Sequence, residues 1–207
     1  MDECGLMPPI IRRIGVTKNN TKTSIVNVAD RLFYEQGFEH TSFADVAKEV
    51  GISRGNFYYH FTTKDQILEA VIERRIENRQ AMLTQWECEF HTPQQRVLAF
   101  IRILLVNEAK IRKYGCPVGT LSIEMSKLSH TGEAGARRIF DVFRVWLTRQ
   151  FTEIGRAGDA DELAMHILAR SQGAATLATT YPTEDFLERE VQQMTAWLEA
   201  ICASSKS

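Results

Sequence analysis

The apolar residues of this chain recur at a helical spacing along most of its length, and this pattern restricts the fold to helices. From Thr23 onward they fall three, four and seven residues apart, which places them on one face of a helix. The five prolines, at positions 8, 9, 93, 117 and 182, leave long intervals in which such helices can form. We predict an all-α fold of about nine helices with no strand.

Capping signals divide this pattern into helices of unequal length. Gly37 and Gly51 suit the left-handed position that ends a helix, and Ser42 with Asp45 resembles a capping box that begins one. The expected helices lie at about 23–36, 42–50, 53–61, 63–90, 93–113, 117–128, 136–154, 159–181 and 184–202.

The composition is that of a globular protein, because 44% of the residues are hydrophobic and 25% are charged. No apolar run approaches the roughly 18 residues that cross a bilayer, and the first residues lack the pattern of a secretory signal. We therefore expect a cytoplasmic protein with no membrane partner. The 25 basic and 26 acidic side chains nearly cancel, so binding to nucleic acid would depend on a local cluster of charge.

The sequence has no motif for catalysis or for a tightly bound group. The four cysteines, at positions 4, 88, 116 and 202, form no CxxC pair, so in a reducing compartment we expect free thiols. Cys88 and His91 could supply two metal ligands, but no second pair with suitable spacing occurs. Neither a G-x-S-x-G motif nor a glycine-rich phosphate loop is present. We expect no metal, no cofactor, no catalytic residue and no enzymatic activity.

Two short helices joined by a turn at Gly51 have the geometry of a helix-turn-helix, whose second helix enters the major groove of DNA. The segment from Val50 to Lys64, VGISRGNFYYHFTTK, contains no acid but carries Arg54, His60 and Lys64. A positive cluster of this kind suits the phosphate backbone. Pairs of short helices also occur in all-α proteins that bind no DNA, so the pattern alone leaves both interpretations open.

The second short helix carries side chains that can read bases. Arg54, at its start, can reach a guanine or a phosphate, and Asn56 offers a donor and an acceptor to a base edge. Gly55 lets the helix approach the DNA closely. Tyr58 and Tyr59 cannot share one helix face, so at least one of them must point away from the core. The neighbouring apolar residues expected in the core are Ala47, Phe57 and Phe61.

The segment at about 23–72, and GFEHTSFADVAKEVGISRGNFYYHFTTKDQIL in particular, resembles the N-terminal domain of TetR-family transcriptional regulators. The family's G-[FY]-x-x-[TS]-[TS] turn, its DVA, its G-[IV]-[ST]-x-G-x-[FL]-Y-x-[HY]-F core and its K-[DE]-x-[LI] all occur here in order. The resemblance implies a homodimer that reads a palindromic operator and binds a small effector in its C-terminal domain. The DNA contacts that it implies are Ser42, Ser53, Arg54, Gly55, Asn56, Tyr58, Tyr59, His60 and Lys64.

We expect three parts in the chain. These are a flexible N-terminal arm at 1–20, a helix-turn-helix DNA-binding domain at 21–79 with the motif itself at about 42–61, and an effector-binding and dimerisation domain at 80–207.

Small side chains between positions 171 and 179 let another helix approach closely. Packing within the chain explains them simply. The resemblance instead implies that the helices at 159–181 and 184–202 pair with those of a second subunit in a four-helix bundle. The residues expected at that interface are Gly173, Ala174, Ala175, Ala178, Met194 and Leu198.

Large apolar side chains of the C-terminal part can line an effector cavity, although the same spacing is typical of a plain core. The candidates are Trp86, Phe90, Phe100, Leu104, Cys116, Met125, Phe143, Trp146 and Met165. Because no cluster of buried charge is evident, we expect an apolar or aromatic effector.

Cys116 is a special case, because the dipole of the helix that begins beside it favours a thiolate. The segment GCPVGTLSIEMS is similar to one in a branch of the TetR family that senses electrophiles or oxidants. A structural thiol is the simpler explanation.

Together these observations favour a DNA-binding transcriptional repressor. A small molecule, or an electrophile or oxidant acting at Cys116, would release it from its operator. The alternative is an all-α small-molecule-binding or scaffolding module that binds no DNA.

Overall fold

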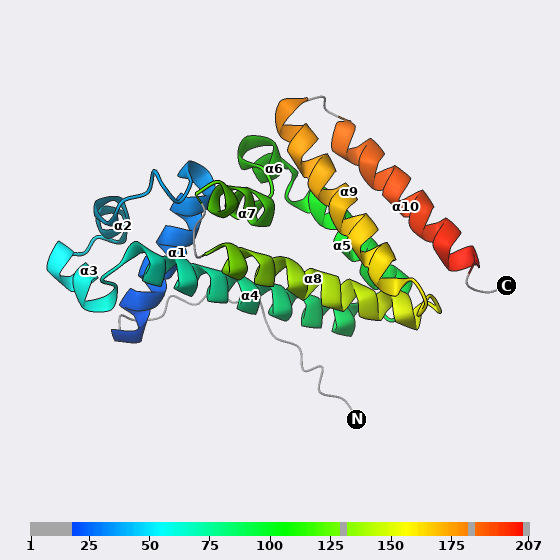
Figure 1. The fold of residues 1–207 in the computed structure, drawn as a ribbon, viewed down its shortest axis with the longest axis horizontal. Coiled ribbons are helices and arrows are strands. Elements are labelled where there is room, and N and C mark those ends of the chain that lie inside the picture. The colour runs from blue at the N-terminus through cyan, green and yellow to red at the C-terminus, as the bar shows by residue number, and fades with distance from the viewer. Residues whose placement is uncertain (1–17, 129–131, 182–184, 205–207) are drawn as a thin grey trace.

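The computed structural model describes residues 18–128, 132–181 and 185–204, and this part of the chain consists of helices joined by short turns (Figure 1). The helices are α1 (Lys18–Gln36), α2 (Phe43–Val50), α3 (Arg54–His60), α4 (Lys64–Glu89), α5 (Pro93–Val106), α6 (Glu108–Tyr114), α7 (Pro117–Lys127), α8 (Glu133–Glu153), α9 (Ala160–Thr180) and α10 (Phe186–Ser204). The described residues form no strand, so the predicted all-α fold class is confirmed. Of the expected arm, 1–17 lie outside the described residues, and 18–20 already belong to α1. No helix in the described ranges is both long and apolar enough to span a membrane.

The helix expected at 93–113 is two helices in the structure. α5 ends at Val106 and α6 begins at Glu108, with Asn107 between them at φ −105° and ψ 11°. The side-chain amide of Asn107 donates to the carbonyl of Ile103 at 2.9 Å. Asparagine competes in this way for backbone groups and favours helix ends, whereas the apolar pattern continues across the break.

Caps fix the ends of the short helices. The hydroxyl of Ser42 accepts the backbone N–H of Asp45, and the Asp45 carboxylate accepts the backbone N–H of Ser42 at 2.9 Å, which completes the capping box of α2. Ser53 and Thr63 cap α3 and α4 through their hydroxyl oxygens. Gly51, at φ 76°, ends α2 in the left-handed conformation that glycine adopts without strain. The orientation of α3 therefore follows from local interactions.

A small aromatic core holds α2 and α3 together. Phe57 and Phe61 are 1% and 3% exposed, and Ala47 is equally buried, as predicted. The ring of Phe43 packs 5.0 Å from that of Phe57, measured between centroids. The α1 helix contacts both α2 and α4 and so closes this core from behind.

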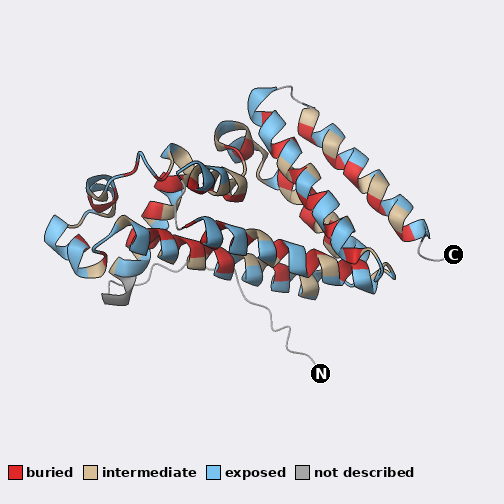
Figure 2. Ribbon diagram, viewed as in Figure 1, coloured by how far each residue is buried: buried red, intermediate tan, exposed pale blue. Residues whose placement is uncertain are grey.

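The long α4 helix joins this N-terminal part to the remainder. It lies side by side with α8, and α8 in turn packs against α9 (Figure 1). The last helix, α10, packs against α5 and α9. Buried residues concentrate where α4 and α8 face each other (Figure 2). The α3 helix is left at the end of the molecule, far from α10.

Candidate DNA-contacting surface and effector cavity

The start of α3 presents an acid-free surface to solvent. Arg54 is the first residue of the helix, and Arg54, Gly55 and Asn56 are all exposed. A Cβ placed on Gly55 would meet no atom within 4 Å, so the surface is open at this point. Among the described residues no carboxylate pairs with Arg54, which leaves its guanidinium available to a ligand.

Two tyrosines of α3 also lie on the surface. Tyr58 is 50% exposed and Tyr59 is 76% exposed, which confirms that at least one points away from the core. The ring of Tyr58 packs edge-on against Phe43 at 5.6 Å, and that of Tyr59 packs against His60 at 5.1 Å. Tyrosine is enriched at protein interfaces, so two exposed tyrosines on this short helix fit a surface that meets a partner.

Ser42 and Lys64 flank α3 and are engaged within the chain. The Ser42 hydroxyl donates to the carboxylate of Asp45 at 2.5 Å. Lys64 Nζ donates to the carbonyl of Glu39 at 3.0 Å and lies 4.4 Å from the ring centroid of Phe38. Burial lowers the pKa of Lys64. A phosphate at either residue would compete with these contacts.

A cavity of about 500 Å³ lies among α1 and the helices from α4 to α9. Four of the nine predicted residues line it, and they are Phe100, Leu104, Cys116 and Phe143. The rings of Phe100 and Phe143 lie 5.6 Å apart. The sequence therefore identified part of the apolar lining.

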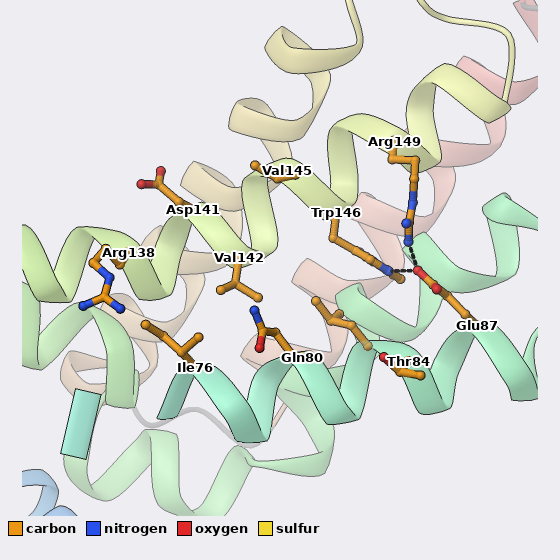
Figure 3. A pocket seen from close by; sticks show the side chains of 11 residues that line it. Ile76, Gln80, Thr84, Glu87, Arg138, Asp141, Val142, Val145, Trp146 and Arg149 are labelled. Carbon is orange, nitrogen blue, oxygen red and sulfur yellow. Dashed lines mark hydrogen bonds and ion pairs between the residues drawn. The ribbon is translucent and has the colours of Figure 1, made fainter. Parts of the chain in front are cut away.

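The other five candidates lie elsewhere. Trp86 and Trp146 pack against each other at 5.9 Å, and Trp146 borders a separate hollow between α4 and α8 (Figure 3). Met125 is fully buried in the core, and Phe90 is half-buried at the end of α4. Met165 is 45% exposed on the outer face of α9, so the prediction that it lines the cavity is wrong. The spacing of apolar residues did not reveal which side of α9 faces outward.

The hollow between α4 and α8 is a weaker candidate for a ligand site. Glu87 accepts the indole N–H of Trp146 at 2.6 Å and also pairs with Arg149 (Figure 3). Farther along, Arg138 pairs with Glu73 of α4 at 2.5 Å. The charged groups Glu87, Arg138 and Arg149 are therefore already engaged in ion pairs within the chain.

The polar wall of the 500 Å³ cavity was missed in the sequence. Arg75 of α4 is 2% exposed, and its Nε donates to Asp30 Oδ1 of α1 at 2.6 Å. Its Nη1 donates to the carbonyl of Pro117 at 2.6 Å. Arg79, one turn farther along α4, belongs to the same wall. The expectation that the cavity holds no buried charge is therefore wrong, because these groups converge from segments far apart in the sequence.

Tyr34 adds a hydroxyl to this wall. It donates to the carbonyl of Gly115 at 2.7 Å and lies 3.2 Å from that of Lys110. Burial, with a smaller contribution from the neighbouring Cys116 thiol, raises the pKa of Tyr34 to about 12. Tyr34 thereby ties α1 to the turn that carries Cys116.

Cys116 is a half-buried free thiol at the N-cap of α7. It lines the cavity and also a neighbouring hollow bordered by Thr120. Cys88, by contrast, is disulfide-bonded, so the expectation of free thiols is wrong for this residue. Within the described ranges no cluster of three or more histidine, cysteine or acidic side chains is arranged to hold a metal.

The α7 helix extends from the cavity to the helix-turn-helix. At its start, the carbonyl of Pro117 accepts from Arg75 at the cavity wall. Farther along, the carboxylate of Glu124 accepts the backbone N–H groups of Phe38 and Glu39 at 2.9 Å each. Since these two residues lie in the turn between α1 and α2, α7 connects the cavity to the helix-turn-helix in addition to α4.

The small residues of α9 are mostly packed inside the chain. The predicted interface residues that are buried within the chain are Ala174, Ala175 and Ala178 of α9 and Met194 and Leu198 of α10. They are therefore not on the surface that a single subunit offers to a partner, and packing within the chain accounts for them. Gly173 is exposed, as are Met165, Ala169 and Leu177 on the same outer face of α9.

Two family models match the chain. The model described as "Bacterial regulatory proteins, tetR family" matches residues 25–71, and "Transcriptional regulator LmrA/YxaF-like, C-terminal domain" matches residues 93–193. The chain belongs to the TetR family of transcriptional regulators. The first match covers most of α1, all of α2 and α3 and the beginning of α4, and the second runs from the start of α5 into α10.

Curated relatives match part of this TetR-family chain. An uncharacterized HTH-type transcriptional regulator in the lacX 3′ region of Lactococcus lactis subsp. lactis is 29% identical over 123 residues, which are 58% of this chain and 63% of the relative. The HTH-type transcriptional regulator TtgR of Pseudomonas putida is 30% identical over 80 residues, which are 39% of this chain and 38% of the relative. Each match spans less than two thirds of the relative's own length.

Solved structures match the fold over most of the chain. A TetR transcriptional regulator from Legionella pneumophila has a TM-score of 0.75 at 23% identity, covering 91% of this chain and 98% of that one. The reduced form of E. coli NemR has a TM-score of 0.74 at 21% identity, covering 84% and 94%. The TetR fold is therefore shared along nearly the whole chain.

Proposed function

We propose that this TetR-family protein is a cytoplasmic transcriptional repressor that binds a palindromic operator as a homodimer and is released by a small-molecule effector. The observation that carries the proposal is the surface of α3, where Arg54, Asn56, Tyr58 and Tyr59 are exposed on a helix without an acid. This helix stands at one end of the molecule (Figure 1), and the exposed start of α3 is free to enter a major groove.

In the proposed complex, Arg54 and Asn56 read base edges and their neighbours position the protein on the phosphates. Arginine suits guanine and asparagine suits adenine because each can form two hydrogen bonds with that base. Gly55 keeps the approach of the helix unobstructed. The proposed backbone contacts are Ser42, Ser53, Tyr58, Tyr59, His60 and Lys64.

The proposed dimer forms through the outer faces of α9 and α10. On α9, Met165 and Leu177 are each 45% exposed on the same outer face, where a partner helix would cover them. On α10, Ala196 and Ala200 are exposed and small enough for a partner helix to approach. A two-fold axis here would supply two α3 helices to the two halves of a palindrome.

The effector is proposed to bind the 500 Å³ cavity and to change the separation of the two α3 helices. The cavity is bordered by α4 and α7, and both helices also contact the N-terminal part. A ligand that favours a conformer with the wrong spacing lowers operator affinity by its difference in affinity for the two conformers. In this scheme residues 21–79 bind DNA and residues 80–207 bind the effector and the second subunit.

The test is the binding of the full chain to the intergenic DNA upstream of its own gene, followed by fluorescence anisotropy over a series of salt concentrations. We expect saturable binding that weakens steeply with salt and exceeds binding to a scrambled duplex. No binding at low salt would instead support an all-α ligand-binding or scaffolding module.

A further inference from the structure

The charges that line the 500 Å³ cavity do not cancel. Arg75 pairs with Asp30 at 2.6 Å, and Arg31 pairs with Glu35 at 3.1 Å. The cations left over on the lining are Arg79 and Lys110. Among the described residues, no carboxylate lies within ion-pair distance of either one. The cavity therefore has a surplus of positive charge.

Arg79 is the more deeply placed of these two cations. It is partly buried on α4, whereas Lys110 is exposed on α6. Burial, and then the neighbouring Arg75 cation, lower the pKa of Arg79, while Asp30 and the Cys116 thiol raise it. The guanidinium remains protonated in any case. Asp30 already binds Arg75, so Arg79 is withdrawn from water without a hydrogen-bonded acid, and an entering anion would relieve this cost.

Much of the remaining lining is apolar. It includes Met82, Phe100, Ile103, Leu104, Phe140 and Phe143. Met82 follows Arg79 by three residues on α4, so the cation and the apolar surface adjoin on one helix face. A volume of about 500 Å³ lies within the range of cavities that enclose drug-sized ligands.

We infer that the effector is an amphipathic organic acid, whose carboxylate pairs with Arg79 and whose apolar body lies against Phe100 and Phe143. This inference rests on the proposed function and narrows its apolar or aromatic effector to an acid. A cationic ligand would face Arg79 and Lys110, and the acids that could attract it are already paired. A neutral ligand would leave the charge of Arg79 uncompensated.

Matched probes test the charge requirement directly. Biphenyl carboxylate, naphthoate and decanoate are titrated into the full-length protein by calorimetry, each beside its primary amide. The amide keeps the shape of the acid and one acceptor oxygen, but it lacks the charge and has an NH2 donor in place of the second oxygen. We expect at least one acid to bind about tenfold or more tightly than its amide, and to release operator DNA as it binds.

Variants of α4 then assign the effect to Arg79. Arg79→Gln should weaken acid binding about tenfold and leave amide binding unchanged, and Arg79→Lys should restore most of the difference. Arg74→Gln is the matched control, because Arg74 stands on the same helix, pairs with Glu77 at 3.6 Å and lies off the cavity lining. Circular dichroism confirms that each variant is folded.

Three outcomes would overturn the inference: no acid binds, the amides bind as tightly as the acids, or Arg79→Gln leaves acid binding unchanged. An acid that binds without releasing DNA would show that it is not the effector. Operator binding by the ligand-free protein is measured in the same preparation. Its absence would refute the proposed function, whereas failure of the acids with operator binding intact would refute only this inference.

Discussion

The two ends of this molecule differ in how their functional side chains are brought together. The proposed DNA-contacting surface lies within residues 42–64, where Ser42, Gly51 and Ser53 set the helix ends through local contacts. The cavity draws on α1 and on every helix from α4 to α9, and its central contact joins Asp30 to Arg75 across 45 positions. A surface of the first kind tolerates changes in its exposed side chains. A cavity of the second kind couples ligand contacts to the stability of the fold.

The largest effect is expected from the core beneath the DNA-contacting surface. Phe57→Ala removes a ring that is 1% exposed and should lower the free energy of unfolding by about 3–5 kcal/mol. Tyr59→Ala is the control on the same helix, and with 76% of its side chain exposed it should change stability by less than about 0.5 kcal/mol. Urea denaturation followed by circular dichroism measures both. Equal losses in the two variants would contradict the assignment of core and surface within α3.

Removing the buried guanidinium of the cavity wall should be nearly as costly. Arg75→Ala leaves Asp30 and the Pro117 carbonyl without their donor and should destabilise the protein by about 3 kcal/mol. Arg74→Ala removes a cation that is 41% exposed and should cost less than about 1 kcal/mol. Thermal unfolding compares the two. A small loss at Arg75 would mean that the polar wall of the cavity contributes little to the stability of the fold.

A change at the exposed end of α3 should affect DNA binding and leave stability intact. Arg54→Ala should weaken operator binding by about 1–3 kcal/mol if the guanidinium reads a base. Anisotropy titrations with the operator and with a scrambled duplex measure the loss on each. A loss of equal size on both sequences would reassign Arg54 to a phosphate.

The link between the two regions is predicted to have a moderate effect. Glu124→Gln weakens the charge-assisted hydrogen bonds to the backbone N–H groups of Phe38 and Glu39 and should cost about 1 kcal/mol. Hydrogen exchange of those two amides should quicken, while Glu133→Gln, an exposed acid at the start of α8, should leave them unchanged. Unaltered exchange in Glu124→Gln would indicate that α7 does not hold the turn before α2.

The difference between local and long-range contacts also explains which features could be predicted from the sequence. The short helices, the core position of Phe57 and the exposure of Tyr59 follow from caps and helix periodicity, both of which are local. The place of Arg79 on the cavity wall could not be predicted from the sequence, because an arginine in a long helix is normally solvated. Only tertiary packing turns it toward the cavity.

In the C-terminal part, the sequence predicted the helices but not which face of each helix is buried. Apolar spacing identified α9, but not that Ala175 faces inward while Met165 faces outward, because small and large side chains occur on both of its sides. The break at Asn107 is local in origin, since the asparagine side chain bonds to the carbonyl four residues back. Asparagine favours helix ends, but the apolar pattern that continues across Asn107 predicted a single helix.

The smallest change in stability is expected for Cys116→Ser. The same variant shows whether this thiol takes part in the release of the protein from its operator. Serine is a good N-cap and close in size, so Cys116→Ser should alter the free energy of unfolding by no more than about 0.5 kcal/mol. If the thiol is a sensor, alkylation by N-ethylmaleimide should fill space beside Tyr34 and Arg79 and release the parent protein from its operator, while Cys116→Ser stays bound. Mass spectrometry confirms that Cys116 is the alkylated residue. A parent protein that is fully alkylated there and still holds its operator would make the thiol structural, and release would then depend on the non-covalent ligand alone.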